Sequence, residues 1–137
     1  MTGLDPKLVE APYELQRTIG FRMCEWSEGH AVFELPITTS IGKRYGIPHG
    51  GVYAMLLDTV MGYAGCFTGD PEQRQYALTL SMTTNFLSRP KGRLLIGTGT
   101  KVGGGARTFF SDGQIVDETG ERIAHGSGVF RYRANAG

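Results

Sequence analysis

The sequence has 137 residues, of which 40% are hydrophobic and 20% charged, and its formal net charge is +1 at pH 7. This length suits one domain with its own core and is too short for two, and the composition excludes disordered and collagen-like chains. The small net charge gives no sign of a nucleic-acid partner. We therefore predict a single domain over residues 1–137, with residues 1–16 as an N-terminal lead-in.

The cysteines and the N-terminus bear on where the protein works. Cys24 and Cys66 lie far apart and outside any CxxC pair, which is typical of free thiols buried in a reducing compartment. The first seven residues contain no basic segment followed by an apolar one, so they do not resemble a secretion signal. No apolar run is a convincing membrane span. We expect a soluble, cytoplasmic protein without a membrane partner.

The N-terminal third carries one weak helical pattern and two strand patterns. A short helix is expected around residues 8–15 of the lead-in, interrupted by Pro12. Apolar residues then alternate with other residues over 19–26 and again over 31–37, as in half-buried strands. The turn Ser-Glu-Gly between the two runs predicts a hairpin.

The next segment is the only convincing long helix. A polar, glycine-bearing loop over residues 38–48 precedes residues 49–67, HGGVYAMLLDTVMGYAGCF, whose apolar side chains repeat at helical spacing. The charged Asp58 in its middle and the glycine-rich flanks indicate a helix buried in a protein core rather than in a bilayer.

Four further strand patterns follow, at residues 77–87, 94–102, 107–116 and 123–132. Turn-forming residues separate the last three, which favours antiparallel pairing. The order of strand, strand, helix and four strands predicts an α+β fold in which an antiparallel sheet of about six strands wraps around one central helix.

The helix carries the motif that points to a family. The sequence HGG at residues 49–51 opens the helix, and Asp58 follows nine residues after the His. This arrangement resembles the hotdog-fold acyl-CoA thioesterases of the 4-hydroxybenzoyl-CoA thioesterase superfamily, and among them the phenylacetate-pathway (PaaI-like) branch. The resemblance covers roughly residues 19–132 and is densest over residues 46–64.

The resemblance implies hydrolysis of an acyl- or aryl-CoA thioester to the free acid and CoA, without a metal or organic cofactor. In that family the backbone N–H corresponding to Gly50 polarises the thioester carbonyl, and the carboxylate corresponding to Asp58 acts as nucleophile or general base. A hydroxyl residue of the following strand, here Thr79, holds the attacking water. His49 is either part of this chemistry or simply the residue that caps the helix. Lys43 stands where family members often carry Asn, so we assign no second carbonyl donor from that loop.

Other candidates concern substrate binding. Gly51 adjoins the polarising glycine. Arg89, Lys91 and Arg107 flank predicted strand ends, where they are either cations for the CoA phosphates or ordinary solvated charges. Aromatic residues contributed partly by different subunits are expected to line the acyl pocket: Tyr53, Tyr63, Phe67 and Phe86.

The spacing of the two catalytic elements predicts an oligomer. Gly50 and Asp58 are eight residues apart, which corresponds to about 12 Å along a helix axis. A carboxylate that attacks the carbonyl, directly or through one water, must lie much closer. A twofold dimer in which Gly50 of one subunit faces Asp58 of the other satisfies both requirements. We expect a homodimer, or a tetramer built from two such dimers.

Two other functions remain open, and a metal site is not expected. The same fold could bind an acyl thioester without hydrolysing it, or hydrate an enoyl-CoA, although the motif typical of hotdog hydratases is missing. His30 and His125 occupy strand-like segments without HxH or HxxxH spacing, so the sequence predicts no metal centre.

Overall fold

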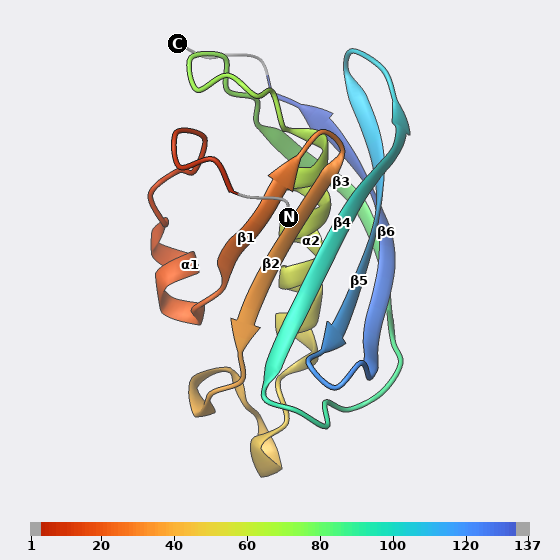
Figure 1. Cartoon of the computed structure of the whole chain (residues 1–137). Coiled ribbons are helices and arrows are strands. Elements are labelled where there is room, and N and C mark those ends of the chain that lie inside the picture. Colours follow the sequence, from red (N-terminus) through yellow and green to blue (C-terminus); the bar gives the residue numbers. More distant parts are fainter. Residues whose placement is uncertain (1–3, 134–137) are drawn as a thin grey trace.

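The computed structural model describes residues 4–133. A curved sheet of six strands surrounds one long helix, α2 (Figure 1). The predicted α+β architecture of a sheet wrapped around a central helix is therefore confirmed. The elements in chain order are α1 (Glu14–Ile19), β1 (Arg22–Ser27), β2 (His30–Pro36), α2 (Gly50–Gly65), β3 (Ala77–Phe86), β4 (Leu94–Gly104), β5 (Thr108–Asp117) and β6 (Arg122–Tyr132).

The order of strands across the sheet differs from their order in the chain. It is β1-β2-β4-β5-β6-β3, with every neighbouring pair antiparallel. β3 therefore forms one edge beside β6, although β4 follows it in sequence. The connection over residues 87–93 leads from β3 to β4 across the end of the molecule at which α2 begins (Figure 1). Among residues 4–133, no strand pairs with the other edge of β3.

The expected helix and first strand of the N-terminal region are displaced. The helix occupies Glu14–Ile19 instead of residues 8–15, and β1 begins at Arg22 instead of residue 19. The reason is Pro12, which disfavours helical geometry in the residue before it, so the helix can form only after it. Gly20 then ends the helix in the left-handed conformation (φ 100°). The first three residues of the predicted lead-in, and residues 134–137 of the predicted domain, lie outside the described residues.

The core forms where α2 meets the concave face of the sheet. Alternate residues of the strands point inward, and α2 is apolar on most of its surface because sheet surrounds it. Within residues 4–133, no helix is both long enough and apolar enough to cross a bilayer. Of the two free cysteines, Cys66 is buried as expected, whereas Cys24 on β1 is only half-buried. The residues with at most 1% exposure include Phe33, Leu35, Leu56, Leu57, Val60, Met61, Leu95, Phe109, Ile115 and Ile123.

Inward-facing glycines of β4 and β5 allow α2 to lie very close to the sheet. A Cβ on Gly99 would lie 2.0 Å from the carbonyl oxygen of Val60, and one on Gly113 would lie 2.9 Å from Cγ of Met61. Real side chains cannot occupy such positions, so the spacing between helix and sheet depends on glycine here. This spacing also sets the position of Asp58, two residues before Val60.

Gly99→Ala is expected to lower the free energy of unfolding by about 3 kcal/mol or more, because the added methyl group meets helix backbone that cannot rotate away. Urea denaturation measures the effect. Gly103→Ala, on the same strand, is the matched control, since a Cβ there has no atom within 4 Å. Equal denaturation midpoints for the two variants would contradict the close packing of α2 on β4.

Candidate active site

A cavity of about 440 Å³ opens beside α2, and both Asp58 and Thr79 line it. The Thr79 hydroxyl donates a hydrogen bond of 2.6 Å to Oδ1 of Asp58. The sheet register between β3 and β6 shifts after Thr79, and such a bulge changes the direction of nearby side chains. A hydrogen bond to a carboxylate is strong and fixes its orientation. Oδ2 of Asp58 has no hydrogen-bond partner among residues 4–133, so this oxygen is available to a substrate or a water.

The start of α2 forms a second polar element. His49 is the N-cap residue, and its Nδ1 accepts a hydrogen bond of 2.9 Å from the Gly51 amide. The neutral imidazole therefore carries its proton on Nε2. Because the Gly51 amide is occupied, the amide that remains without an acceptor among residues 4–133 is that of Gly50. An unpaired N–H at a helix N-terminus is suited to bind an oxygen that carries negative charge.

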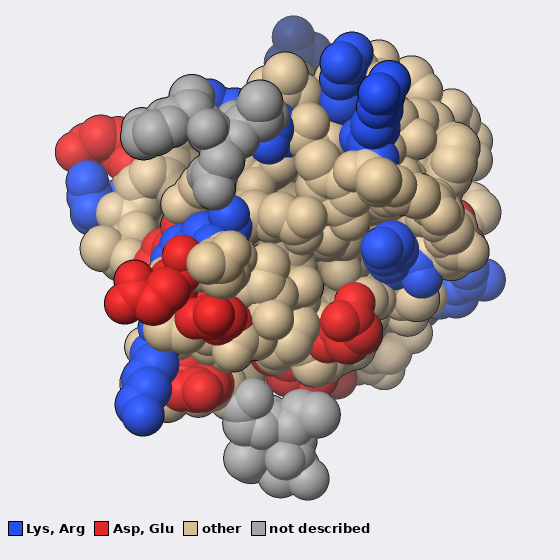
Figure 2. Space-filling model, turned by 90° about the horizontal axis from the view of Figure 1, so that it is seen from above, with Lys and Arg blue, Asp and Glu red and all other residues tan. Residues whose placement is uncertain are grey.

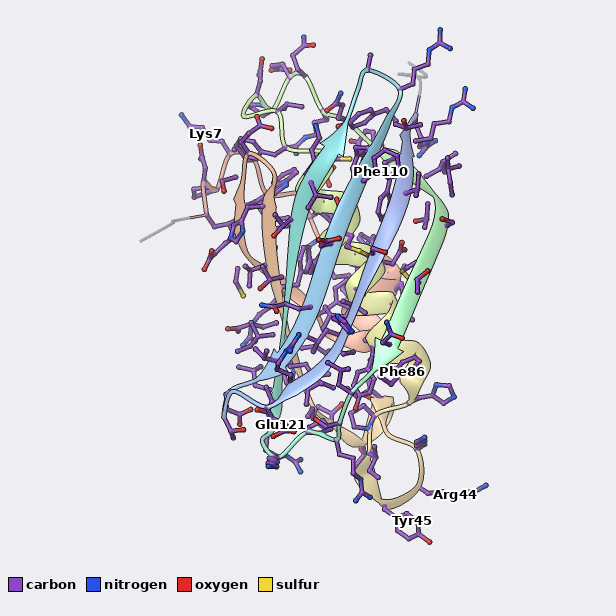
Figure 3. All side chains as sticks on the ribbon, turned by 90° about the vertical axis from the view of Figure 1, so that its right-hand side faces the viewer. Lys7, Arg44, Tyr45, Phe86, Phe110 and Glu121 are labelled. Carbon is purple, nitrogen blue, oxygen red and sulfur yellow. The ribbon has the colours of Figure 1, made fainter. Side chains whose placement is uncertain are left out.

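These two elements are separate within one subunit. The cavity lining includes Asp58 and Thr79 but none of residues 49–51. Next to the helix start lies Phe86 at the end of β3 (Figure 3), whose ring would be 3.5 Å from a Cβ on Gly50. Eight residues of helix correspond to about 12 Å along its axis. The free amide and the carboxylate of one chain therefore do not converge on one substrate atom.

The three cations suggested for the CoA phosphates lie at opposite ends of the sheet. Arg89 and Lys91 belong to the β3–β4 connection, at the end where α2 begins, and Lys91 Nζ forms an ion pair of 3.1 Å with Glu121. Arg107 lies at the β4–β5 turn, at the other end (Figure 1). In the view onto that second end, Lys and Arg side chains are scattered over the face, separated by uncharged surface and by Asp and Glu side chains (Figure 2). One subunit does not bring the three together.

A buried aspartate holds the segment that carries Arg89 and Lys91. Asp117 is 1% exposed and accepts hydrogen bonds from the amides of Lys91 and Gly92 through Oδ2, and from Thr119 and Glu121 through Oδ1. Burial alone raises the pKa of Asp117, but these hydrogen bonds outweigh it and hold the pKa well below its usual range. The carboxylate thus ties the β3–β4 connection to the β5–β6 turn.

The cavity has a second wall that the sequence patterns do not indicate. Residues 5–13, here called the N-terminal strap, lie beside α2, and Leu8, Glu10 and Tyr13 line the cavity. Burial raises the pKa of the Tyr13 hydroxyl; a hydrogen bond with Thr59 opposes this, and the charges of Asp58 and Glu10 add to it. Of the four aromatic residues expected to bind the acyl group, only Tyr63 lines this cavity. The other aromatic residues that line it are Tyr13, Trp26, Tyr76 and Phe130.

Known proteins resemble this chain in sequence and in structure. A family model described as the thioesterase superfamily matches residues 45–124. The 1,4-dihydroxy-2-naphthoyl-CoA hydrolase of Listeria monocytogenes is 27% identical over 105 residues, which are 77% of this chain and 84% of that protein.

Two solved structures have the same fold. The PaaI protein from the phenylacetic acid degradation operon of E. coli superposes with a TM-score of 0.76 at 22% identity, over 88% of this chain and 84% of that one. The BH2602 protein of Bacillus halodurans, solved with CoA, has a TM-score of 0.74 at 24% identity, over 88% and 79% of the two chains. Because the family match spans more than half of the sequence, this chain belongs to the thioesterase superfamily, as its helix motif predicts, and is a thioester hydrolase with the hotdog fold.

Proposed function

We propose that the protein hydrolyses an acyl- or aryl-CoA thioester to the free acid and CoA, with Asp58 as its catalytic carboxylate. The observation that carries this proposal is the Asp58 side chain, oriented by Thr79 at 2.6 Å and facing a cavity of about 440 Å³. Two comparisons support a CoA thioester as the substrate. One relative is named a 1,4-dihydroxy-2-naphthoyl-CoA hydrolase, and one structural neighbour was solved with CoA. The aromatic residues around the cavity favour an aryl group.

The chemistry follows from the two polar elements. The Gly50 amide donates a hydrogen bond to the thioester oxygen as negative charge develops on it, and one such donor contributes about 2.7–4 kcal/mol to catalysis. Asp58 either removes a proton from water as the water oxygen attacks the carbonyl carbon, or attacks that carbon itself to form an anhydride that water then cleaves. In both routes the carbon–sulfur bond breaks and the sulfur leaves as the CoA thiol after gaining a proton.

The proposed site lies between two subunits, and β3 is the element that would join them. It is an edge strand of ten residues, and Leu78 and Leu80 on it are 55% and 56% exposed. A long edge strand with exposed apolar side chains is a template for pairing with another chain. Pairing through β3 would bring the Gly50 end of one α2 toward Asp58 of the other subunit, which a single chain cannot do.

A panel of aryl- and acyl-CoA thioesters tests the reaction. We expect the wild-type protein to release free thiol from at least one member with a kcat/KM of about 10⁴ M⁻¹s⁻¹ or more, in the range usual for enzymes. A thiol-reactive dye follows the release, and the same assay with EDTA should give unchanged rates, since the proposed chemistry uses no metal. Tight binding of a thioester without hydrolysis of any panel member would instead favour an acyl-thioester-binding protein.

A further inference from the structure

The N-terminal strap is fixed against the cavity by contacts with distant parts of the chain. The Arg74 guanidinium donates hydrogen bonds to the carbonyl oxygens of Leu8 at 2.8 Å and Lys7 at 3.4 Å. The Leu8 side chain is buried, with 8% exposure. These contacts hold residues 7–10 beside α2 and place the next polar side chain, Glu10, on the cavity wall.

Two tyrosines hold the Glu10 carboxylate. The Tyr63 hydroxyl donates to Oε1 at 3.4 Å and the Tyr76 hydroxyl donates to Oε2 at 3.2 Å. Among residues 4–133 no Lys, Arg or His forms an ion pair with Glu10. Each carboxylate oxygen has more than one acceptor site, so both can accept a further hydrogen bond from a ligand.

The negative charge of Glu10 acts on other groups in the cavity wall. Burial raises the pKa of the Cys66 thiol to about 12, and the Glu10 charge adds to this rise. Burial likewise raises the pKa of Tyr63, again with a contribution from Glu10, so its hydroxyl remains a donor. At this part of the cavity wall the ligand therefore meets a hydrogen-bond acceptor whose negative charge disfavours a further negative charge beside it, while Arg74 and Arg133 line other parts of the cavity.

Glu10 of the strap contacts Tyr63 of α2, and the position of Tyr63 along that helix identifies which part of a ligand Glu10 would meet. Tyr63 follows Asp58 by five residues, which is about 7.5 Å along the helix axis. A thioester carbonyl at Asp58 would therefore place the far side of a single aromatic ring, or a chain of similar length, near the Tyr63 and Glu10 side chains. All three residues line the same cavity.

We propose that Glu10 is a specificity-determining residue: it favours acyl groups that carry a hydroxyl at the end remote from the thioester and disfavours acyl groups that carry a carboxylate there. This inference rests on the proposed thioesterase function and concerns the acyl end of the same site. A hydroxyl donor gains a hydrogen bond to a charged acceptor, whereas a carboxylate meets a like charge. Hydrogen bonds to charged groups are among the stronger ones in proteins, so the expected preference for the hydroxyl is about tenfold.

Glu10→Gln tests the proposal because the amide keeps the size of the side chain and can still accept from a tyrosine, while the charge is lost. The substrates are benzoyl-CoA, its 4-hydroxy derivative and its 4-carboxy derivative. We expect the ratio of kcat/KM for the hydroxy over the unsubstituted thioester to fall about tenfold in Glu10→Gln, and the rate for the carboxy derivative to rise. Glu14→Gln on α1, whose side chain is 89% exposed and lies outside the cavity, should leave that ratio and the rate for the carboxy derivative unchanged.

The same three thioesters are also titrated calorimetrically into Asp58→Asn and Asp58→Asn/Glu10→Gln, so that preference is measured without turnover. A purely structural role of Glu10 would change all three rates or Kd values by one common factor, and that outcome would overturn the specificity assignment. A charge-dependent shift in the Kd ratios without hydrolysis by the wild type would support the role of Glu10 and refute the proposed function. Absence of binding for all three thioesters would refute both.

Discussion

Asp58→Asn is expected to lower kcat for the best thioester of the panel about 10²–10⁴-fold, with a much smaller change in KM. The carboxylate supplies the lone pair that attacks the carbonyl or accepts the proton of water, and an amide can do neither. Asn has the same shape and can still accept the hydrogen bond that Thr79 gives to Asp58 at 2.6 Å, so the cavity and the fold should persist. Steady-state kinetics with the thiol assay measures the loss.

The control for this prediction is another carboxylate that does not face the cavity. Asp112 on β5 is exposed on the outer face of the sheet, and Asp112→Asn should leave kcat unchanged. Circular dichroism and thermal unfolding of both variants establish that the fold is retained. Near-normal kcat for Asp58→Asn would show that the catalytic group lies elsewhere, and the proposed mechanism would then be wrong.

Mixing two inactive variants should restore activity if the site is shared between subunits. Asp58→Ala removes the carboxylate. Gly50→Pro removes the amide N–H, and proline is well tolerated at the first position of a helix, where Gly50 lies. The loss of one oxyanion donor costs about 10²–10³-fold in kcat, so each variant alone should be nearly inactive.

In a heterodimer of the two variants, one site combines the intact Gly50 of one subunit with the intact Asp58 of the other. Random association of equal amounts makes half of the dimers heterodimers with one working site of two, so about a quarter of the wild-type activity should return. Two different affinity tags verify that heterodimers form. The control mixture of Asp58→Ala with Asp58→Asn contains no intact site and should stay inactive. No recovery in verified heterodimers of Asp58→Ala and Gly50→Pro would mean that the two groups do not act on a common substrate.

Patterns along the chain were sufficient to predict the elements that bury one face. The helical repeat around Asp58 predicted α2, which spans Gly50–Gly65, and the alternation of residues 94–102, 107–116 and 123–132 predicted β4, β5 and β6 to within two residues. These patterns are reliable because burial on one side repeats with the period of the backbone conformation. The N-terminal helix, which has no buried residue, lacked such a signal and was misplaced.

The arrangement of the candidate active site depends on tertiary structure much more than the positions of the helix and strands do. The resemblance implied roles for both Asp58 and Thr79, but their contact across 21 residues depends on β3 pairing with β6 at the edge of the sheet. Glu10 was not predicted, because its partners Tyr63 and Tyr76 are 53 and 66 residues away and the strap has no periodic pattern. Arg107 was grouped with Arg89 although they lie at opposite ends of the sheet.

The sequence by itself thus determined the types and order of the elements, the buried helix with its single acid, and the family to which the chain belongs. Only the tertiary structure decided which strand lies at the edge, which amide of the helix start remains free, and which distant residues close the cavity around Asp58. The physical reason is that local patterns record how often a side chain is buried, whereas strand pairing and contacts between distant segments depend on how whole elements pack against one another.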